Sequence, residues 1–109
     1  MSKQLVVYIT SWCPGCRHAQ DALAELGLAA RYVNIGRDTE AAGLLRALTG
    51  FESVPTFVIV AGEGFDPITP PAALPAGKGP RGVDRGSVLT EPAEAPLREW
   101  LVKNGFLQA

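Results

Sequence analysis

The sequence predicts an α/β fold in which a four-stranded mixed sheet is flanked by three helices. Apolar, β-branched runs alternate along the chain with segments whose apolar residues recur every three or four positions. Helix-linked strands come first and adjacent strands come later, an order that indicates a mixed sheet. With 109 residues, 47% of them hydrophobic, the chain is predicted to form a single domain over residues 1–109.

The first strand and helix have the strongest sequence signals. Residues 4–10 form a continuous apolar run, which is typical of a fully buried strand. The next helix is predicted to begin with Pro14, because a first helical position needs no N–H donor, and to stop at Gly27. Its apolar positions are Cys16, Ala19, Ala22, Leu23 and Leu26.

The second strand and helix follow the same order. Alternating apolar residues predict a strand over residues 31–35. Asp38 is the predicted N-cap of a helix that runs to about Leu48. The inner face of this helix is expected to be Ala41, Leu44, Leu45 and Leu48.

The rest of the chain predicts two strands, over residues 56–61 and 86–90, and a closing helix between Pro92 and Gly105. Residues 62–85 separate these strands and form a Pro/Gly-rich insertion without periodicity. So long a loop is uncommon in a compact domain. We expect a solvated excursion, with a substrate- or partner-binding loop as the alternative. The core positions of the closing helix are Leu97, Trp100 and Leu101.

The charge balance excludes several classes of partner. Ten Lys and Arg residues face eleven Asp and Glu residues, for a net charge of −1 at pH 7. This balance provides no basic surface for nucleic acid or for an acidic membrane. The apolar run near the N-terminus is too short for a signal peptide or a membrane span. We expect a monomer in the cytoplasm, where a lone cysteine pair is more often catalytic or metal-binding than structural.

Both cysteines of the chain lie at the start of the first predicted helix, in the segment Cys13-Pro14-Gly15-Cys16. A thiol there faces the unpaired N–H groups and the positive end of the helix, which stabilise a thiolate. We expect Cys13 to be the exposed nucleophile, with a pKa lowered from about 8.5 into the range of about 3.5–7.5, and Cys16 to remain a buried thiol. Helical geometry places the sulfurs within about 60° of each other around the axis, so they can form a disulfide.

A metal site is the competing interpretation of these cysteines. Tetrahedral zinc needs four ligands, and the chain offers only Cys13, Cys16 and His18. His18 is offset from Cys16 by about 200° around the helix, so we expect it to point elsewhere. A dimer that holds zinc or an iron–sulfur cluster, and a purely structural cysteine pair, remain alternatives.

Val54-Pro55, at the start of the third strand, is the second candidate feature. Proline is tolerated at the first position of a strand, so an ordinary trans bond is one interpretation. The other is a cis bond packed beside the cysteines, which would leave the Val54 N–H and C=O free to pair with an extended thiol-containing substrate.

Trp12 stands directly before the first cysteine. It is either a partly buried core residue or an exposed platform that shields the thiolate and stacks against the substrate.

Together these motifs resemble the glutaredoxins of the thioredoxin fold. The resemblance rests on Cys13-Pro14-Gly15-Cys16 after a first strand, on Leu48-Thr49-Gly50 followed by Val54-Pro55, and on the order of strands and helices. The lead-in Tyr8-Ile9-Thr10-Ser11-Trp12-Cys13 and the segment 86–92 are similar to the mycoredoxin branch. The resemblance covers residues 4–61 and 86–106.

The resemblance implies that Cys13 attacks a disulfide, and it matches Cys16 to the resolving cysteine. Either Cys16 then resolves the mixed disulfide or a second small thiol does so. Glutathione-using members commonly have a lysine near the position of Thr10 and a Gly-Gly turn near Leu89-Thr90, and this sequence has neither. The co-substrate implied is therefore another low-molecular-weight thiol or a flavoprotein reductase. The residues expected to contact the substrate are Trp12, Pro14, Val54, Pro55 and Thr90.

The function predicted on these grounds is that of a thiol–disulfide oxidoreductase without a bound cofactor or metal. Its substrates would be protein disulfides or mixed disulfides between a protein and a small thiol. Two functions of other classes remain alternatives. One is a dimeric iron–sulfur module, which a proline after the first cysteine disfavours in the family, and the other is a docking domain whose long loop recruits a partner.

Overall fold

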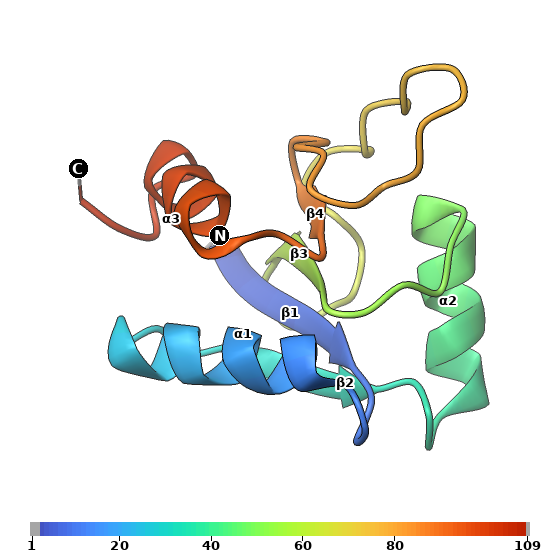
Figure 1. Ribbon diagram of the computed structural model, residues 1–109, viewed down its shortest axis with the longest axis horizontal. Coiled ribbons are helices and arrows are strands. Elements are labelled where there is room, and N and C mark those ends of the chain that lie inside the picture. Colours follow the sequence, from blue (N-terminus) through green and yellow to red (C-terminus); the bar gives the residue numbers. More distant parts are fainter. Residues whose placement is uncertain (1–2, 109) are drawn as a thin grey trace.

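A computed structural model describes residues 3–108 and contains one mixed sheet (Figure 1). Its strands lie in the order β2-β1-β3-β4, with β1 parallel to β2 and antiparallel to β3, and with β3 antiparallel to β4. This arrangement confirms the predicted fold class, including the mixed sheet. The strands are β1 (Lys3–Ile9), β2 (Arg31–Asn34), β3 (Thr56–Ala61) and β4 (Val88–Thr90).

Three helices flank the sheet, α1 (Pro14–Glu25), α2 (Thr39–Thr49) and α3 (Glu94–Lys103). The predicted N-cap of α2 is confirmed, because the Asp38 carboxylate accepts a hydrogen bond from the backbone N–H of Ala41. Within residues 3–108 no helix has the length and the hydropathy of a membrane span.

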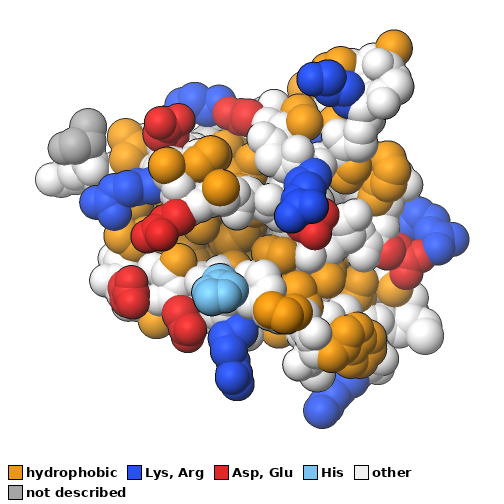
Figure 2. Space-filling view, viewed as in Figure 1, with side chains coloured by type: hydrophobic (Ala, Val, Ile, Leu, Met, Phe, Trp, Pro, Cys, Tyr) orange, Lys and Arg blue, Asp and Glu red, His pale blue; other side chains and the backbone are white. Residues whose placement is uncertain are grey.

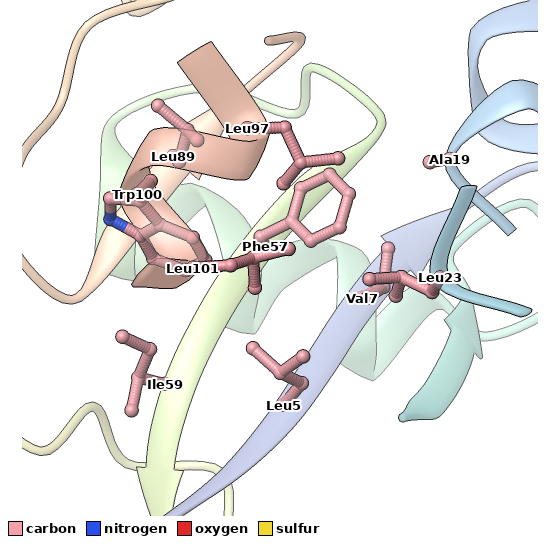
Figure 3. Close-up of a cluster of buried hydrophobic side chains, with 10 residues drawn as sticks. All are labelled: Leu5, Val7, Ala19, Leu23, Phe57, Ile59, Leu89, Leu97, Trp100 and Leu101. Carbon is pink, nitrogen blue, oxygen red and sulfur yellow. The ribbon is translucent and has the colours of Figure 1, made fainter. Parts of the chain in front are cut away.

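The two faces of the sheet are covered by different helices, because successive side chains of a strand point to opposite faces. On β1, Leu5 and Val7 belong to the cluster that packs with α1 and α3, whereas Val6 and Tyr8 belong to the cluster under α2. Figure 3 shows the first of these clusters, in which the predicted core residue Trp100 meets the ring of Phe57 edge-on. The cluster comprises Leu5, Val7, Ala19, Leu23, Phe57, Ile59, Leu89, Leu97, Trp100 and Leu101.

The prediction that Leu44 lies on the inner face of α2 is wrong. Its side chain is 41% exposed, whereas Ala41 and Leu45 on the same helix are buried. The buried stripe of α2 is narrow, and Leu44 lies about 100° around the helix from Leu45, beside the exposed ring of Phe65.

The insertion between β3 and β4, drawn in yellow to orange in Figure 1, contains no helix or strand but is held to the domain by hydrogen bonds. The N–H of Ile68 donates to the Ile59 carbonyl at 2.8 Å, and the N–H of Gly82 donates to the Thr90 carbonyl at 2.7 Å. The insertion is therefore not only the solvated excursion that was expected, because segments near both of its ends pair with strands of the sheet.

Arg85 links the insertion to the C-terminus of α2. Its side chain is buried, and it donates to the Ala72 carbonyl at 2.7 Å and to the Thr49 carbonyl at 2.9 Å. The carbonyl of Thr49 belongs to the last residue of α2, where the helix dipole favours a cation.

Replacement of Arg85 by Ala should release the insertion. The loss of two charge-assisted hydrogen bonds is expected to lower the free energy of unfolding by about 2–4 kcal/mol. Trypsin should cleave faster after the exposed Lys78, which lies within the insertion. The matched control is Arg98→Ala, which removes an exposed arginine from α3. Unchanged cleavage after Lys78 would contradict the anchoring role of Arg85.

Candidate active site

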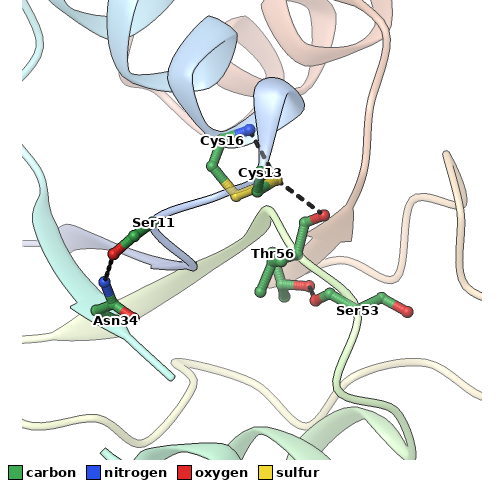
Figure 4. The surroundings of a disulfide bond; sticks show 7 residues. Ser11, Cys13, Cys16, Asn34, Ser53 and Thr56 are labelled. Atoms are coloured by element: carbon green, nitrogen blue, oxygen red, sulfur yellow. Dashed lines mark hydrogen bonds between the residues drawn. A yellow bond between two sulfur atoms is a disulfide. The ribbon is translucent and has the colours of Figure 1, made fainter. Parts of the chain in front are cut away.

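Cys13 and Cys16 are joined by a disulfide at the N-terminus of α1 (Figure 4). Their Cα atoms are 5.2 Å apart, within the range that a disulfide bridges without backbone movement. Cys13 is the N-cap residue and half-buried, whereas Cys16 is only 2% exposed because it points into the core side of the helix. The relative exposure of the two cysteines agrees with the sequence prediction.

The sulfur of Cys13 lies where the first turn of α1 presents its backbone donors. The N–H of Cys16 donates to Cys13 Sγ at 3.0 Å. Pro14, at the first helical position, has no N–H of its own. A hydrogen bond from an N–H at a helix N-terminus favours the charged form of a thiol.

Val54-Pro55 is cis and lies directly beside the sulfur. The Val54 carbonyl oxygen is 3.7 Å from Cys13 Sγ. Within residues 3–108 the N–H of Val54 has no hydrogen-bond partner. Pro55 is buried, and a Cβ added at Gly15 would lie 3.5 Å from its Cδ atom, so α1 and the Val54-Pro55 turn are in close contact.

A cleft of about 620 Å³ opens from Cys13 and runs between α1 and α3. Figure 2 looks onto this face, where acidic side chains flank a hollow with a largely hydrophobic floor. Apolar side chains of the floor include those of Ala19, Ala22 and Leu97. The ionisable groups that line the cleft are the carboxylates of Asp21, Glu25, Glu91 and Glu94, the guanidinium of Arg81 and the imidazole of His18.

Not every residue expected at the site reaches this cleft. Cys13, Pro14, Val54 and Pro55 line it, whereas Trp12 does not. Thr90 is 1% exposed, and its hydroxyl is hydrogen-bonded to that of Thr56 at 3.0 Å. A substrate contact from the Thr90 side chain does not fit this placement, because the side chain is buried against Thr56 of the neighbouring strand.

Glu91 lines the cleft, whereas the residue before it, Thr90, was expected there and does not line it. Its φ of 46° lies in the left-handed region, which is uncommon for residues other than glycine and recurs at functional sites. The N–H of Glu91 donates to the Pro55 carbonyl at 2.7 Å, so this turn is fixed directly to the cis-proline.

His18 was expected to point elsewhere than Cys16 as a solvated side chain, and its side chain is exposed. It also lines the cleft that opens from Cys13. The offset of about 200° from Cys16 turns His18 to the outer face of α1, and the cleft opens there. No three His, Cys, Asp or Glu side chains within residues 3–108 are grouped so that they could hold a metal ion.

Trp12 is 74% exposed, so it is not a core residue, and its role as a platform for the substrate stays a prediction. One edge of its ring lies against Gly36, where an added Cβ would come within 2.7 Å of the indole. Asn34 holds the segments on both sides of this contact together, because its side chain donates to the Ser11 hydroxyl at 2.8 Å and accepts from the Gly36 N–H at 2.9 Å. The Ser11–Asn34 bond is drawn in Figure 4.

A family model described as Glutaredoxin matches residues 5–64, more than half of the chain. The chain belongs to the glutaredoxin family. Membership supports thiol–disulfide oxidoreductase activity in general, and both cysteines of this glutaredoxin lie inside the matched region. The match identifies the family, and the mycoredoxin-like branch stays a prediction. No curated protein matches the sequence.

Three charged residues of the cleft lie outside the matched region, namely Arg81, Glu91 and Glu94. Sequence reasoning did not single them out. Glu91 lies just before the predicted closing helix and Glu94 lies within it, so both could have been proposed from the position of that helix. No signal in the sequence pointed to Arg81, because the fold of the insertion determines where it lies.

Gly36→Ala should displace the indole of Trp12 from its position against residue 36. We expect the indole N–H resonance of Trp12 to shift in NMR spectra while that of the buried Trp100 stays in place. The free energy of unfolding should change by no more than about 0.5 kcal/mol, because an exposed ring can move away. Gly43→Ala is the matched control, since an added Cβ there meets nothing within 4 Å. An unmoved Trp12 resonance in Gly36→Ala would contradict the close contact between Trp12 and Gly36.

Proposed function

We propose that this glutaredoxin reduces protein disulfides, or mixed disulfides between a protein and a small thiol, through Cys13 and Cys16. One observation carries the proposal: the Cys13 sulfur lies at the N-terminus of α1, opens into the cleft, and has the cis-proline backbone beside it. The same proposal has the protein act as a monomer in the cytoplasm, without nucleic-acid or membrane partners.

The first step forms a mixed disulfide. The Cys13 thiolate attacks one sulfur of the substrate disulfide, and the other sulfur leaves as a thiolate that takes up a proton from water. An extended substrate can pair with the free N–H of Val54, as a strand pairs with a sheet edge. This pairing would hold the scissile sulfur in line with Cys13.

The second step releases the reduced substrate. The Cys16 thiol loses its proton and attacks Cys13 Sγ, so that the substrate sulfur leaves as a thiolate and the disulfide between Cys13 and Cys16 forms. Two electrons have then passed from the cysteine pair to the substrate. The Cα separation of 5.2 Å supports this step, because the disulfide needs no backbone movement.

Two groups beside Cys13 act on its protonation in opposite directions. The Cys16 N–H at 3.0 Å favours the thiolate, whereas the Val54 carbonyl at 3.7 Å would accept a hydrogen bond from the thiol. The shorter contact, which is reinforced by the helix dipole, is the stronger one. We therefore propose that the thiolate predominates at neutral pH.

A low-molecular-weight thiol or a flavoprotein reductase would return the two electrons. Two molecules of small thiol would reduce the pair and leave as their own disulfide, or a flavoprotein would reduce it by dithiol exchange. Within the cleft lining the only Lys or Arg side chain is Arg81, which comes from the insertion. That single cation supports a thiol other than glutathione, whose two carboxylates call for basic partners.

The Cys16→Ser variant should trap the mixed disulfide at Cys13. Incubated with a peptide that carries a mixed disulfide, it should gain the mass of one adduct, because no second thiol is present to resolve it. The same variant isolated from cells should carry the native small thiol. Intact-mass spectrometry gives both results. Cys13→Ser, which keeps the buried thiol, is the control and should stay unmodified. The absence of any adduct on Cys16→Ser would refute the proposed first step.

Alkylation of the reduced protein should report a lowered pKa for Cys13. The rate of reaction with iodoacetamide is expected to rise with pH and to level off below about 8.5, the ordinary value for a thiol, because only the thiolate reacts. Peptide mapping should locate the modification on Cys13, since Cys16 is buried. The Cys16→Ser variant retains the backbone N–H donor and should give the same midpoint. A rate that still rises above pH 8.5 would count against a stabilised thiolate.

A further inference from the structure

We propose that the cleft between α1 and α3 binds a positively charged polypeptide segment, so that the preferred substrates carry Lys or Arg near the disulfide cysteine. This inference rests on the proposed function and assigns a substrate class to the same site. It draws on the charge of the cleft, on its apolar floor and on its continuity with the reactive sulfur.

The cleft holds an excess of negative charge that the protein itself does not neutralise. Its lining carries four carboxylates and one guanidinium. The ion pairs found within residues 3–108 are Arg46–Glu52 and Lys103–Asp84, and neither involves a residue of the cleft. Since the whole chain carries a net charge of only −1, the negative charge is concentrated at this site.

The carboxylates stand on both sides of the path that a bound segment would take. Asp21 and Glu25 belong to α1, Glu94 belongs to the first turn of α3, and Glu91 lies on the turn beside Pro55. Because one end of the cleft is Cys13 itself, a substrate attached there extends between these side chains.

The floor of the cleft also suits Lys and Arg side chains of a substrate. Lys and Arg combine a long apolar stem with a charged end, so they can cover apolar surface while the charge reaches a carboxylate. Pro14, Ala22 and Pro92 supply accessible apolar surface, because each is exposed or half-buried, whereas Ala19 and Leu97 are buried. Asp21, Glu25 and Glu94 supply the carboxylates around it. A purely acidic surface without this floor would attract small cations but would give a peptide little to pack against.

The negative charge of the cleft also disfavours anionic thiols. Glutathione carries two carboxylates and one ammonium group, so it would meet like charges along most of the cleft. Arg81 is the single exception within the lining, and it comes from the insertion. Charge therefore discriminates between substrates that share the same disulfide chemistry.

The experiment compares three synthetic peptides whose central cysteine forms a mixed disulfide with 2-mercaptoethanol. They differ only in carrying Lys, Gln or Glu on both sides of the cysteine. The fully reduced protein reacts in a single turnover, in which its cysteine pair becomes a disulfide while the peptide thiol and 2-mercaptoethanol are released. Mass spectrometry follows the second-order rate constant, so no reductase is needed.

At low ionic strength the Lys peptide should react about 10-fold faster than the Glu peptide, with the Gln peptide between them. An exposed ion pair changes an equilibrium constant by about 1.4- to 5-fold, and several act together here. The preference should shrink in 0.5 M salt, where the screening length is only about 3–5 Å. The double variant Asp21→Asn, Glu25→Gln should lower it about 2- to 10-fold.

The control is Glu99→Gln, which removes a carboxylate from α3 that does not line the cleft. It should keep the preference of the original protein. Equal rates for the Lys and Glu peptides, or an equal effect of the control and the double variant, would overturn the inference while leaving the oxidoreductase function intact.

If none of the peptides reacts, the proposed function fails, and binding then tests the cleft separately. Versions of the Lys and Glu peptides with Ser in place of Cys are titrated into the protein, and NMR follows the backbone resonances of α1 and α3. Tighter binding of the Lys peptide, weakened by the double variant, supports the charge selection. Equal binding of the two peptides refutes it.

Discussion

The pairing of β1 with β3 is the constraint on which the site depends. In this antiparallel pair Tyr8 is opposite Thr56, so the chain leaves β1 at the same edge of the sheet where it enters β3. Cys13 follows one strand and Pro55 precedes the other, and both therefore lie at that edge. A register slip would separate the sulfur from the Val54 backbone and would also turn every core side chain of β1 to the wrong face.

Burial on both faces of the sheet is what fixes this register. Leu5 and Val7 pack under α1 and α3, whereas Val6 and Tyr8 pack under α2. The face with two helices leaves a cleft between them, and that cleft begins at the N-terminus of α1. On the face with one helix, a pocket lined by Tyr8, Ala41 and Leu44, among others, includes neither cysteine. The architecture thus decides on which side a substrate approaches the sulfur.

Local chemistry made the elements and the cysteine pair predictable. Pro14 and Asp38 indicate helix starts by their effect on the first turn, and strand periodicity depends only on near neighbours. The isomer of Val54-Pro55 was left open, because packing beside the cysteines selects it. Arg81 and the exposure of Leu44 were beyond sequence reasoning, since both depend on the path of the insertion and on the width of the buried stripe of α2.

The carboxylates of the cleft and the proposed thiolate of Cys13 place opposing electrostatic demands on the same site. Carboxylates near a thiol disfavour its ionisation, whereas the Cys16 N–H at 3.0 Å favours it. The N–H is in direct contact with the sulfur, whereas the carboxylates line an open cleft, where salt in the solvent screens their charge. Their effect on the free thiol is therefore weak. A cationic segment bound as proposed would offset the charge of the carboxylates, so their opposition to the thiolate would be smallest when such a substrate is in place.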